Sequence, residues 1–169
     1  MRYKKTFATL IAIISSMLFF SCGTSQTAIE KANKARLLNQ QIQNLNFTFN
    51  ATYAYPQNYG SVYLSPYYDV KVSTDTVQVY LPYYGRAYTA PMNANEGGIK
   101  FVSTDFEYEI EQGKKAGNWM INIRTNDTPR PFTLNFDLWD NGTARLNVQD
   151  RDRQNISFQG NIEPLKKPE

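Results

Sequence analysis

From residue 46 onward, apolar and polar side chains alternate with a period of two, and this alternation constrains the fold more than any other feature of the sequence. In one such run, Phe132, Leu134 and Phe136 are separated by single polar residues. The pattern is typical of β-strands that bury one face of a sheet. It recurs at residues 47–53, 62–64, 68–72, 77–81, 106–110, 119–123, 132–138, 144–148 and 156–162. The sequence therefore predicts a mainly β domain over residues 46–163, with about 8–10 strands.

Most connections between these runs are short and contain turn-forming residues. Asn141 and Gly142 lie between two of the runs, and such a pair predicts a hairpin turn in which both residues have positive φ. Strands that follow one another through short turns pair as an antiparallel meander. Because each strand has one apolar and one polar face, we expect the meander to form a small barrel, half-barrel or sandwich. Residues 164–169 are expected to be a C-terminal tail.

One N-terminal helix is predicted before the strands, over residues 28–45. Thr27 and Glu30 have the spacing of a capping box at a helix start. A thin apolar face favours a helix that packs on the sheet or closes one end of a barrel, with a spacer or partner-binding helix as the alternative. The apolar residues of this face, spaced three and four apart, are Ala28, Ala32, Ala35, Leu38, Ile42 and Leu45.

The first 21 residues have the layout of an export signal. Arg2, Lys4 and Lys5 precede an uncharged apolar run from residue 7 to residue 20. This run of 14 residues is short for a transmembrane helix, which needs about 20. We therefore expect residues 1–21 to be a cleaved lipoprotein signal peptide, and a retained helix is the alternative.

Cys22 is the one cysteine of the chain, and it directly follows the apolar run and the small residue Ser21. This arrangement resembles the lipobox, at which lipoprotein signal peptidase cuts and leaves an acylated cysteine as the first residue. We predict lipidation of Cys22 and a lipidated polar tether over residues 22–27. Several acyl chains anchor a protein durably, because each buried methylene adds about 0.8 kcal/mol.

The predicted anchor indicates a location in the cell envelope. The tether carries no acidic run of the kind that resembles a surface-export signal. We therefore expect a protein on the outer membrane that faces the periplasm, and the inner membrane and the outward face stay open as alternatives.

Charge and composition exclude several classes of function. The chain has 18 basic and 15 acidic residues, but three basic residues lie in the signal, so the rest of the chain has 15 of each. No basic surface is left to indicate nucleic-acid binding. With no histidine and with Cys22 acylated, Ser-His-Asp and Cys-His catalysis and the usual zinc and copper sites are excluded. We expect no catalytic residue, no metal and no cofactor.

Tyrosines concentrate between residues 53 and 88. A tyrosine offers a flat apolar face and one polar tip, which suits ligand stacking or contact with a partner. The long irregular loop at residues 84–98 is expected to edge a binding site. The alternative is that these rings fill core and rim positions of strands and that Arg86 pairs with an acid. The predicted ligand- or partner-binding residues are Tyr80, Tyr83, Tyr84, Arg86 and Tyr88.

Two groups of acidic residues are candidates for other chemistry. Glu107, Glu109 and Glu111 share one face of a predicted strand, and glycosidases use paired carboxylates. Because carboxylates in a row do not flank a substrate from both sides, we expect a solvated face. Asp150 and Asp152 lack the glycine and the distal glutamate of a calcium-binding loop, so a charged hairpin turn is expected there.

Three segments carry a family resemblance. They are Leu-Pro-Tyr-Tyr-Gly-Arg-Ala-Tyr at 81–88, Asp-Asn-Gly-Thr-Ala-Arg-Leu-Asn-Val at 140–148 and Arg-Gln-Asn-Ile-Ser-Phe-Gln-Gly at 153–160. Over about residues 28–162, the chain resembles the domain of unknown function 4251 family, small exported lipoproteins of anaerobic Gram-negative bacteria. The resemblance implies location and a single domain, and it implies no activity because the family has none assigned.

Three functions from different classes are compatible with these features. We expect a non-catalytic binding module for a small apolar ligand, lipid or glycan, held at a barrel mouth or cleft. The alternative is a structural or assembly lipoprotein that contacts another envelope protein through an exposed aromatic patch. An enzyme limited to carboxylate, lysine or tyrosine chemistry is the third hypothesis, and it requires acids that converge in a pocket.

Overall fold

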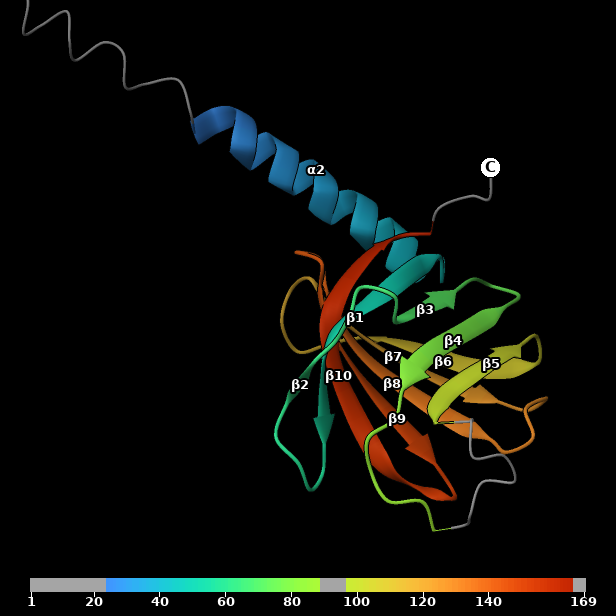
Figure 1. The fold of residues 1–169 in the computed structure, drawn as a ribbon. Helices are drawn as coiled ribbons and strands as arrows, with labels where there is room; N and C mark the ends of the chain where they lie inside the picture. The colour runs from blue at the N-terminus through green and yellow to red at the C-terminus, as the bar shows by residue number, and fades with distance from the viewer. Residues whose placement is uncertain (1–23, 89–96, 166–169) are drawn as a thin grey trace, which may run out of the picture. The chain divides into compact units, whose positions relative to one another are not determined.

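The computed structural model describes residues 24–88 and 97–165 (Figure 1). The chain divides into two units, residues 1–33 and 34–169. The first unit contributes the start of helix α2, which spans Thr24–Gln43. No helix among the described residues is long and apolar enough to cross a membrane. Cys22 and the predicted signal peptide lie outside the described residues.

Helix α2 begins at Thr24 rather than at the predicted capping box of Thr27 and Glu30, so it includes part of the predicted tether. Glycine, threonine and serine, the residue types at 23–25, are all accepted N-caps, so the sequence offers several possible helix starts besides Thr27. The capping-box spacing alone therefore did not locate the start. The last turns of the helix belong to the second unit, in which Leu38 and Ile42 are buried as predicted.

Helix α2 ends in a turn that leads directly into the sheet. Leu45 has a φ of 48°, and its N–H donates to Ile42 O at 3.1 Å, while Asn46 N–H donates to Gln41 O at 2.8 Å. These are the two hydrogen bonds of a Schellman motif, in which a left-handed residue follows the helix. Leucine takes this position instead of glycine because its side chain is buried in the core.

Ten strands follow the helix and form one antiparallel sheet (Figure 1). The prediction of a mainly β fold with one helix is confirmed. The strands are β1 (Phe47–Pro56), β2 (Val62–Tyr63), β3 (Asp69–Val72), β4 (Val77–Pro82), β5 (Gly98–Ser103), β6 (Phe106–Gln112), β7 (Asn118–Thr125), β8 (Phe132–Trp139), β9 (Thr143–Asp150) and β10 (Arg153–Pro164).

The sheet is a meander whose first and last strands meet. The strand order is β5-β4-β3-β1-β10-β9-β8-β7-β6, with β2 beside β1. Strands β1 and β10 pair along their length, from Phe47 opposite Pro164 to Pro56 opposite Ile156. The ladder is interrupted only between β5 and β6, among the strands that the structure describes. The sheet is therefore nearly closed into a barrel, one of the predicted forms.

Aspartate 127 holds the connection between β5 and β6. Its carboxylate accepts hydrogen bonds from Ser103 Oγ, from Thr104 N–H at 2.8 Å and from Asp105 N–H at 3.1 Å. The Ser103 hydroxyl, followed by the backbone N–H of Thr104, lowers the pKa of Asp127 from 3.8 to about 2. Asp127 lies between β7 and β8, so these hydrogen bonds fix the short turn that joins the two edge strands against the neighbouring connection.

The barrel interior is filled by the alternating apolar residues that the sequence indicated. Every second residue of β8, from Phe132 to Leu138, is buried. The Phe136 ring meets those of Phe47 and Phe49 edge to face, with centroid distances of 5.6 and 6.0 Å. Such pairs add about 0.5–1.5 kcal/mol beyond the burial of area. The intervening polar side chains consequently face outward.

Strand β5 is absent from the predicted runs. Its first half alternates as expected, with Ile99 buried and Lys100 exposed. Its last two residues depart from the pattern, because the inward residue Ser103 is polar and fully buried, whereas the outward residue Val102 is apolar and exposed. Gly98, the last residue of the predicted long loop, is the first residue of this strand. An alternation that holds for only three residues is too short to identify a strand.

The turn between β8 and β9 also differs from the prediction. Gly142 has a φ of 92°, but Asn141 is not among the residues with positive φ. Gly142 N–H donates to Trp139 O at 2.9 Å and closes the turn. The hairpin is confirmed, whereas the predicted turn with two left-handed residues is wrong. A turn of residues 139–142 whose last residue is a left-handed glycine also reverses the chain.

Candidate functional site

Tyr80 lies on the outer face of β4 and is 38% exposed. Its ring stacks on that of Tyr68, with a centroid distance of 5.6 Å and an interplanar angle of 18°. Lys100 Nζ lies 4.6 Å from the centre of the Tyr80 ring. Tyr80 thus belongs to an aromatic group on the outside of β3, β4 and β5.

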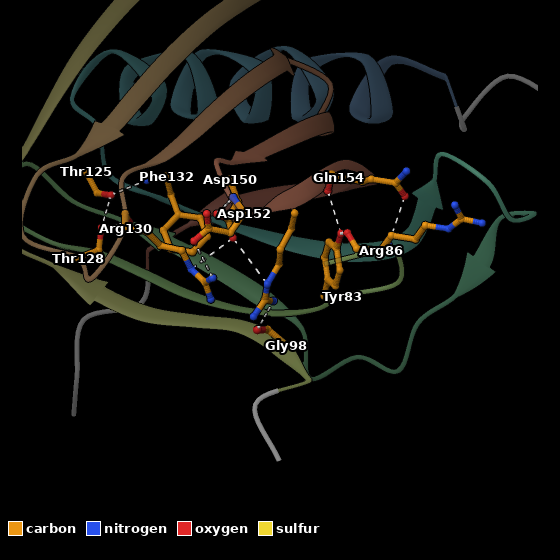
Figure 2. A network of polar contacts seen from close by, with 11 residues as sticks. Tyr83, Arg86, Gly98, Thr125, Thr128, Arg130, Phe132, Asp150, Asp152 and Gln154 are labelled. Atoms are coloured by element: carbon orange, nitrogen blue, oxygen red, sulfur yellow. Dashed lines mark hydrogen bonds and ion pairs between the residues drawn. The ribbon is translucent and has the colours of Figure 1, made fainter. Parts of the chain in front are cut away.

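Tyr83 and Arg86 fasten the segment after β4 to the start of β10 (Figure 2). The Tyr83 hydroxyl lies 2.9 Å from Arg86 O and 3.1 Å from Gln154 O, and its one proton serves these two acceptors. Gln154 N–H donates to Arg86 O at 3.1 Å, and Arg86 N–H donates to Gln154 Oε1 at 3.2 Å. Burial raises the pKa of Tyr83. The contacts use the backbone of Arg86, whose side chain points away from Tyr83.

The other two predicted residues differ in burial. Tyr84 is half-buried and packs against the core. Tyr88 is 70% exposed, and its N–H donates to Asp152 O at 2.7 Å. Residues 89–96 of the predicted loop lie outside the described residues. Three hollows on the described surface are lined by other residues, so the five predicted residues share none of them.

A buried charged network adjoins Tyr83 (Figure 2). The Asp150 carboxylate, whose side chain is 4% exposed, lies 3.4 Å from Arg130 Nε and 3.7 Å from Arg153 Nε. Arg153 donates to Gly98 O at 3.1 Å, and its guanidinium lies 5.0 Å from the centre of the Tyr83 ring. Arg130 and Arg153 both form ion pairs with the Asp150 carboxylate. The segment from Asp150 to Arg153 is therefore a charged hairpin turn, as predicted, rather than a calcium-binding loop.

The three glutamates Glu107, Glu109 and Glu111 occupy exposed positions of the edge strand β6. They line none of the three hollows. In the part of the chain that the structure describes, no group of three or more His, Cys, Asp or Glu side chains is placed to hold a metal ion. The solvated face predicted for these glutamates agrees with their exposure.

One hollow with the chemistry of a binding site lies on the outer face of β7, β8, β9, β10 and β1. Its volume is about 500 Å³, and we call it the outer-face hollow. Its lining includes three side-chain amides, a serine hydroxyl, one carboxylate, one guanidinium, a tyrosine ring and a methionine. Sites for polar ligands with flat apolar faces use such a combination. The exposed or partly exposed side chains that line it are Tyr55, Met120, Asn135, Asp137, Arg145, Asn147, Ser157 and Gln159.

Strand register brings these residues together in rows. Residues that lie opposite one another in neighbouring antiparallel strands share a face of the sheet. The first row crosses five strands as Asn122, Asn135, Asn147, Ser157 and Tyr55. The second row crosses the same strands as Met120, Asp137, Arg145, Gln159 and Tyr53.

Hydrogen bonds orient the side chains of the outer-face hollow. Asn147 Nδ2 donates to Ser157 Oγ at 3.0 Å. The Tyr55 hydroxyl donates to Gln159 Oε1 at 3.0 Å and holds the ring at the edge of the hollow. An asparagine or glutamine side chain has two N–H donors and an acceptor oxygen. These amides therefore keep hydrogen-bonding capacity for a ligand beyond the bonds that orient them.

The outer-face hollow is not evident from the sequence. Its residues are the polar members of the alternating runs, and in a sequence they look like any solvated strand face. One signal was available, since asparagine is unfavourable in strands and yet recurs at outward positions 122, 135 and 147. Only the register shows that these three asparagines lie side by side.

Comparisons with known proteins agree with the fold. The crystal structure of a DUF4251 family protein from Bacteroides eggerthii matches with a TM-score of 0.58 and 12% sequence identity, over 79% of this chain and 89% of that chain. No curated protein matches the chain. Residues 29–162 match the family described as domain of unknown function DUF4251. The chain therefore belongs to the DUF4251 family, as its sequence resemblance implied.

Proposed function

We propose that this chain is a non-catalytic binding module of the cell envelope, anchored by a lipid on Cys22, whose outer-face hollow binds a glycan. The observation that carries the proposal is the row of asparagine, serine and tyrosine side chains across five strands. Amides and hydroxyls donate to and accept from sugar hydroxyls. The flat face of Tyr55 at the edge of the hollow suits the apolar face of a sugar ring.

The polar end groups in the hollow favour a glycan over a lipid or a small apolar ligand. Most of the surface of the outer-face hollow is apolar, but seven of the side chains that line it end in a polar group, whereas the barrel interior is filled by buried apolar side chains. An apolar ligand would cover these polar groups without pairing them, which costs about 1–3 kcal/mol for each group. A ligand rich in hydroxyls instead replaces the hydrogen bonds that these groups made to the displaced water.

Binding is tested with the full chain, purified in detergent, on an array of neutral and acidic oligosaccharides. Tyr55→Ala and Asn147→Ala are the test variants, because both residues line the outer-face hollow. Tyr67→Ala is the matched control, since Tyr67 is a more exposed tyrosine outside the hollow. We expect each test variant to weaken binding about tenfold, a loss of about 1.4 kcal/mol, and the control to bind like wild type.

Two results would contradict the proposed binding function. One is that no oligosaccharide binds the wild-type chain. The other is that Tyr55→Ala and Tyr67→Ala bind the same glycan with the same affinity as wild type, since binding would then lie elsewhere.

The lipid anchor is tested at Cys22. We expect the wild-type chain to sediment with membranes and its N-terminal peptide to begin at an acylated Cys22 by mass spectrometry. Cys22→Ser is expected to abolish acylation. A mature chain with an unmodified Cys22 would remove the anchor from the proposal and leave the binding module.

A second candidate function is contact with another envelope protein. Its support is a group of tyrosines in two ring pairs, Tyr53 with Tyr63 at 5.3 Å and Tyr68 with Tyr80 at 5.6 Å. All of them are exposed except Tyr68, which is half-buried. Tyrosines are enriched at protein interfaces. Cross-linking on membranes is expected to join a partner to wild type but not to Tyr63→Ala, whereas glycan binding stays intact in that variant.

A further inference from the structure

A second hollow lies beside the outer-face hollow on the same side of the sheet. Its volume is about 460 Å³. Thr133 and Gln149 line it. Thr133 lies two residues before Asn135 in β8, and Gln149 lies two residues after Asn147 in β9. Because every second residue of a strand faces the same side, the second hollow adds a third row to the two rows of the outer-face hollow.

The two hollows are joined by side-chain contact. Gln149 Nε2, in the second hollow, donates to Asn147 Oδ1, in the outer-face hollow, at 3.2 Å. Along β7, the rows run from Met120 to Arg124, which is about 13 Å at about 3.3 Å for each residue. This is the length of an oligosaccharide rather than of a single sugar ring.

Positive charge distinguishes the second hollow from the first. Arg124 and Arg151 line it, both are exposed, and no ion pair joins either one to a carboxylate among the described residues. Glu107 is opposite Arg124 in the register without forming such a pair. The two arginines therefore leave guanidinium groups available to a ligand.

The carboxylates at this hollow are already neutralised. Asp150, which lines it, is held between Arg130 and Arg153 (Figure 2). Asp152 lies 3.6 Å from the same Arg130. Two arginines thus balance these two aspartates, and the charges of Arg124 and Arg151 remain in excess.

We infer that Arg124 and Arg151 form a subsite for an anionic substituent of the glycan, a carboxylate, sulfate or phosphate, next to the sugar rings held in the outer-face hollow. A guanidinium binds such groups through two parallel N–H donors. The inference rests on the proposed function and specifies its ligand class as an acidic oligosaccharide.

The test uses matched oligosaccharides that differ only in charge. A uronic-acid oligosaccharide and its carboxyl-reduced, neutral counterpart are bound to the full chain in detergent. We expect the acidic member to bind about tenfold more tightly at low salt, with an advantage that shrinks as salt screens the charges. In the Arg124→Gln/Arg151→Gln variant, the advantage is lost and the neutral member binds as it does to wild type.

A charge-matched control separates a local subsite from the overall charge of the protein. Lys34→Gln/Lys114→Gln removes two exposed positive charges that line neither hollow, and it is expected to keep the preference. Equal binding of the two oligosaccharides to wild type, or a preference that survives in the arginine variant, overturns the inference but not the glycan-binding proposal. If neither binds and the array is also blank, the proposed function fails.

Discussion

Replacing Arg153 with methionine tests whether buried charge holds one end of the barrel together. Arg153→Met keeps an unbranched side chain but removes the guanidinium. Asp150 then retains only Arg130, and Gly98 O loses its donor. Removing one partner of a buried ion pair costs about 3–5 kcal/mol. A hydrogen bond from a charged group, such as that from Arg153 to Gly98 O, contributes about 1.5–3 kcal/mol. Since Arg130 still faces Asp150, we expect a loss of about 3 kcal/mol in the free energy of unfolding.

The assay is urea denaturation followed by circular dichroism. With a slope of about 2 kcal/mol per molar urea, the midpoint is expected to fall by about 1.5 M. Arg86→Met is the control, because the contacts of Arg86 use its backbone, and its effect is expected within about 0.5 kcal/mol. Adding Asp150→Asn to Arg153→Met is expected to recover part of the loss, since no buried carboxylate then lacks its partner. A loss below about 1 kcal/mol for Arg153→Met would refute the reasoning.

Three further predictions concern the core, a strand contact and pH. Phe136→Ala is expected to lower the free energy of unfolding by about 3–5 kcal/mol in the same assay. Gly160→Ala is expected to destabilise the β1–β10 ladder, because a Cβ there meets the backbone of β1, whereas Gly60→Ala has open space; amide exchange of β1 reports the difference. The pKa of Asp127 lies below its usual value of 3.8, at about 2, so its carboxylate stabilises the fold at pH values above about 3.8. This contribution is lost as the pH falls toward 2 and is absent in Asp127→Asn, which a comparison of acid unfolding measures.

Period-two alternation predicted the barrel because the central inward positions of β7 to β10 are apolar, whereas the buried polar residues Asn118, Thr125 and Arg153 lie at strand ends. It failed at β5, where a hydrogen bond from the buried Ser103 to Asp127 satisfies an inward polar residue. The partner that makes such a residue acceptable lies 24 positions away. Local pattern therefore cannot reveal it.

The candidate site was less predictable than the fold. A cluster of tyrosines in the sequence led to the segment 80–88, but Tyr83 uses its hydroxyl to fasten two backbone segments. The outer-face hollow takes its residues from five strands, and no two of its asparagines are neighbours in the chain. Composition shows which side chains are present, whereas the register decides which of them meet.

The pairing of β1 with β10 has a consequence for the time course of folding. Tyr55 and Gln159, which meet across this ladder, are 104 positions apart, and contacts between distant residues slow folding to about milliseconds or seconds. Because synthesis begins at the N-terminus, the barrel cannot be completed until the final strand has been made. Until then, β1 and β9 present unpaired edges that invite aggregation, so a chaperone that shields these edges would act on this protein at the stage when it is most vulnerable.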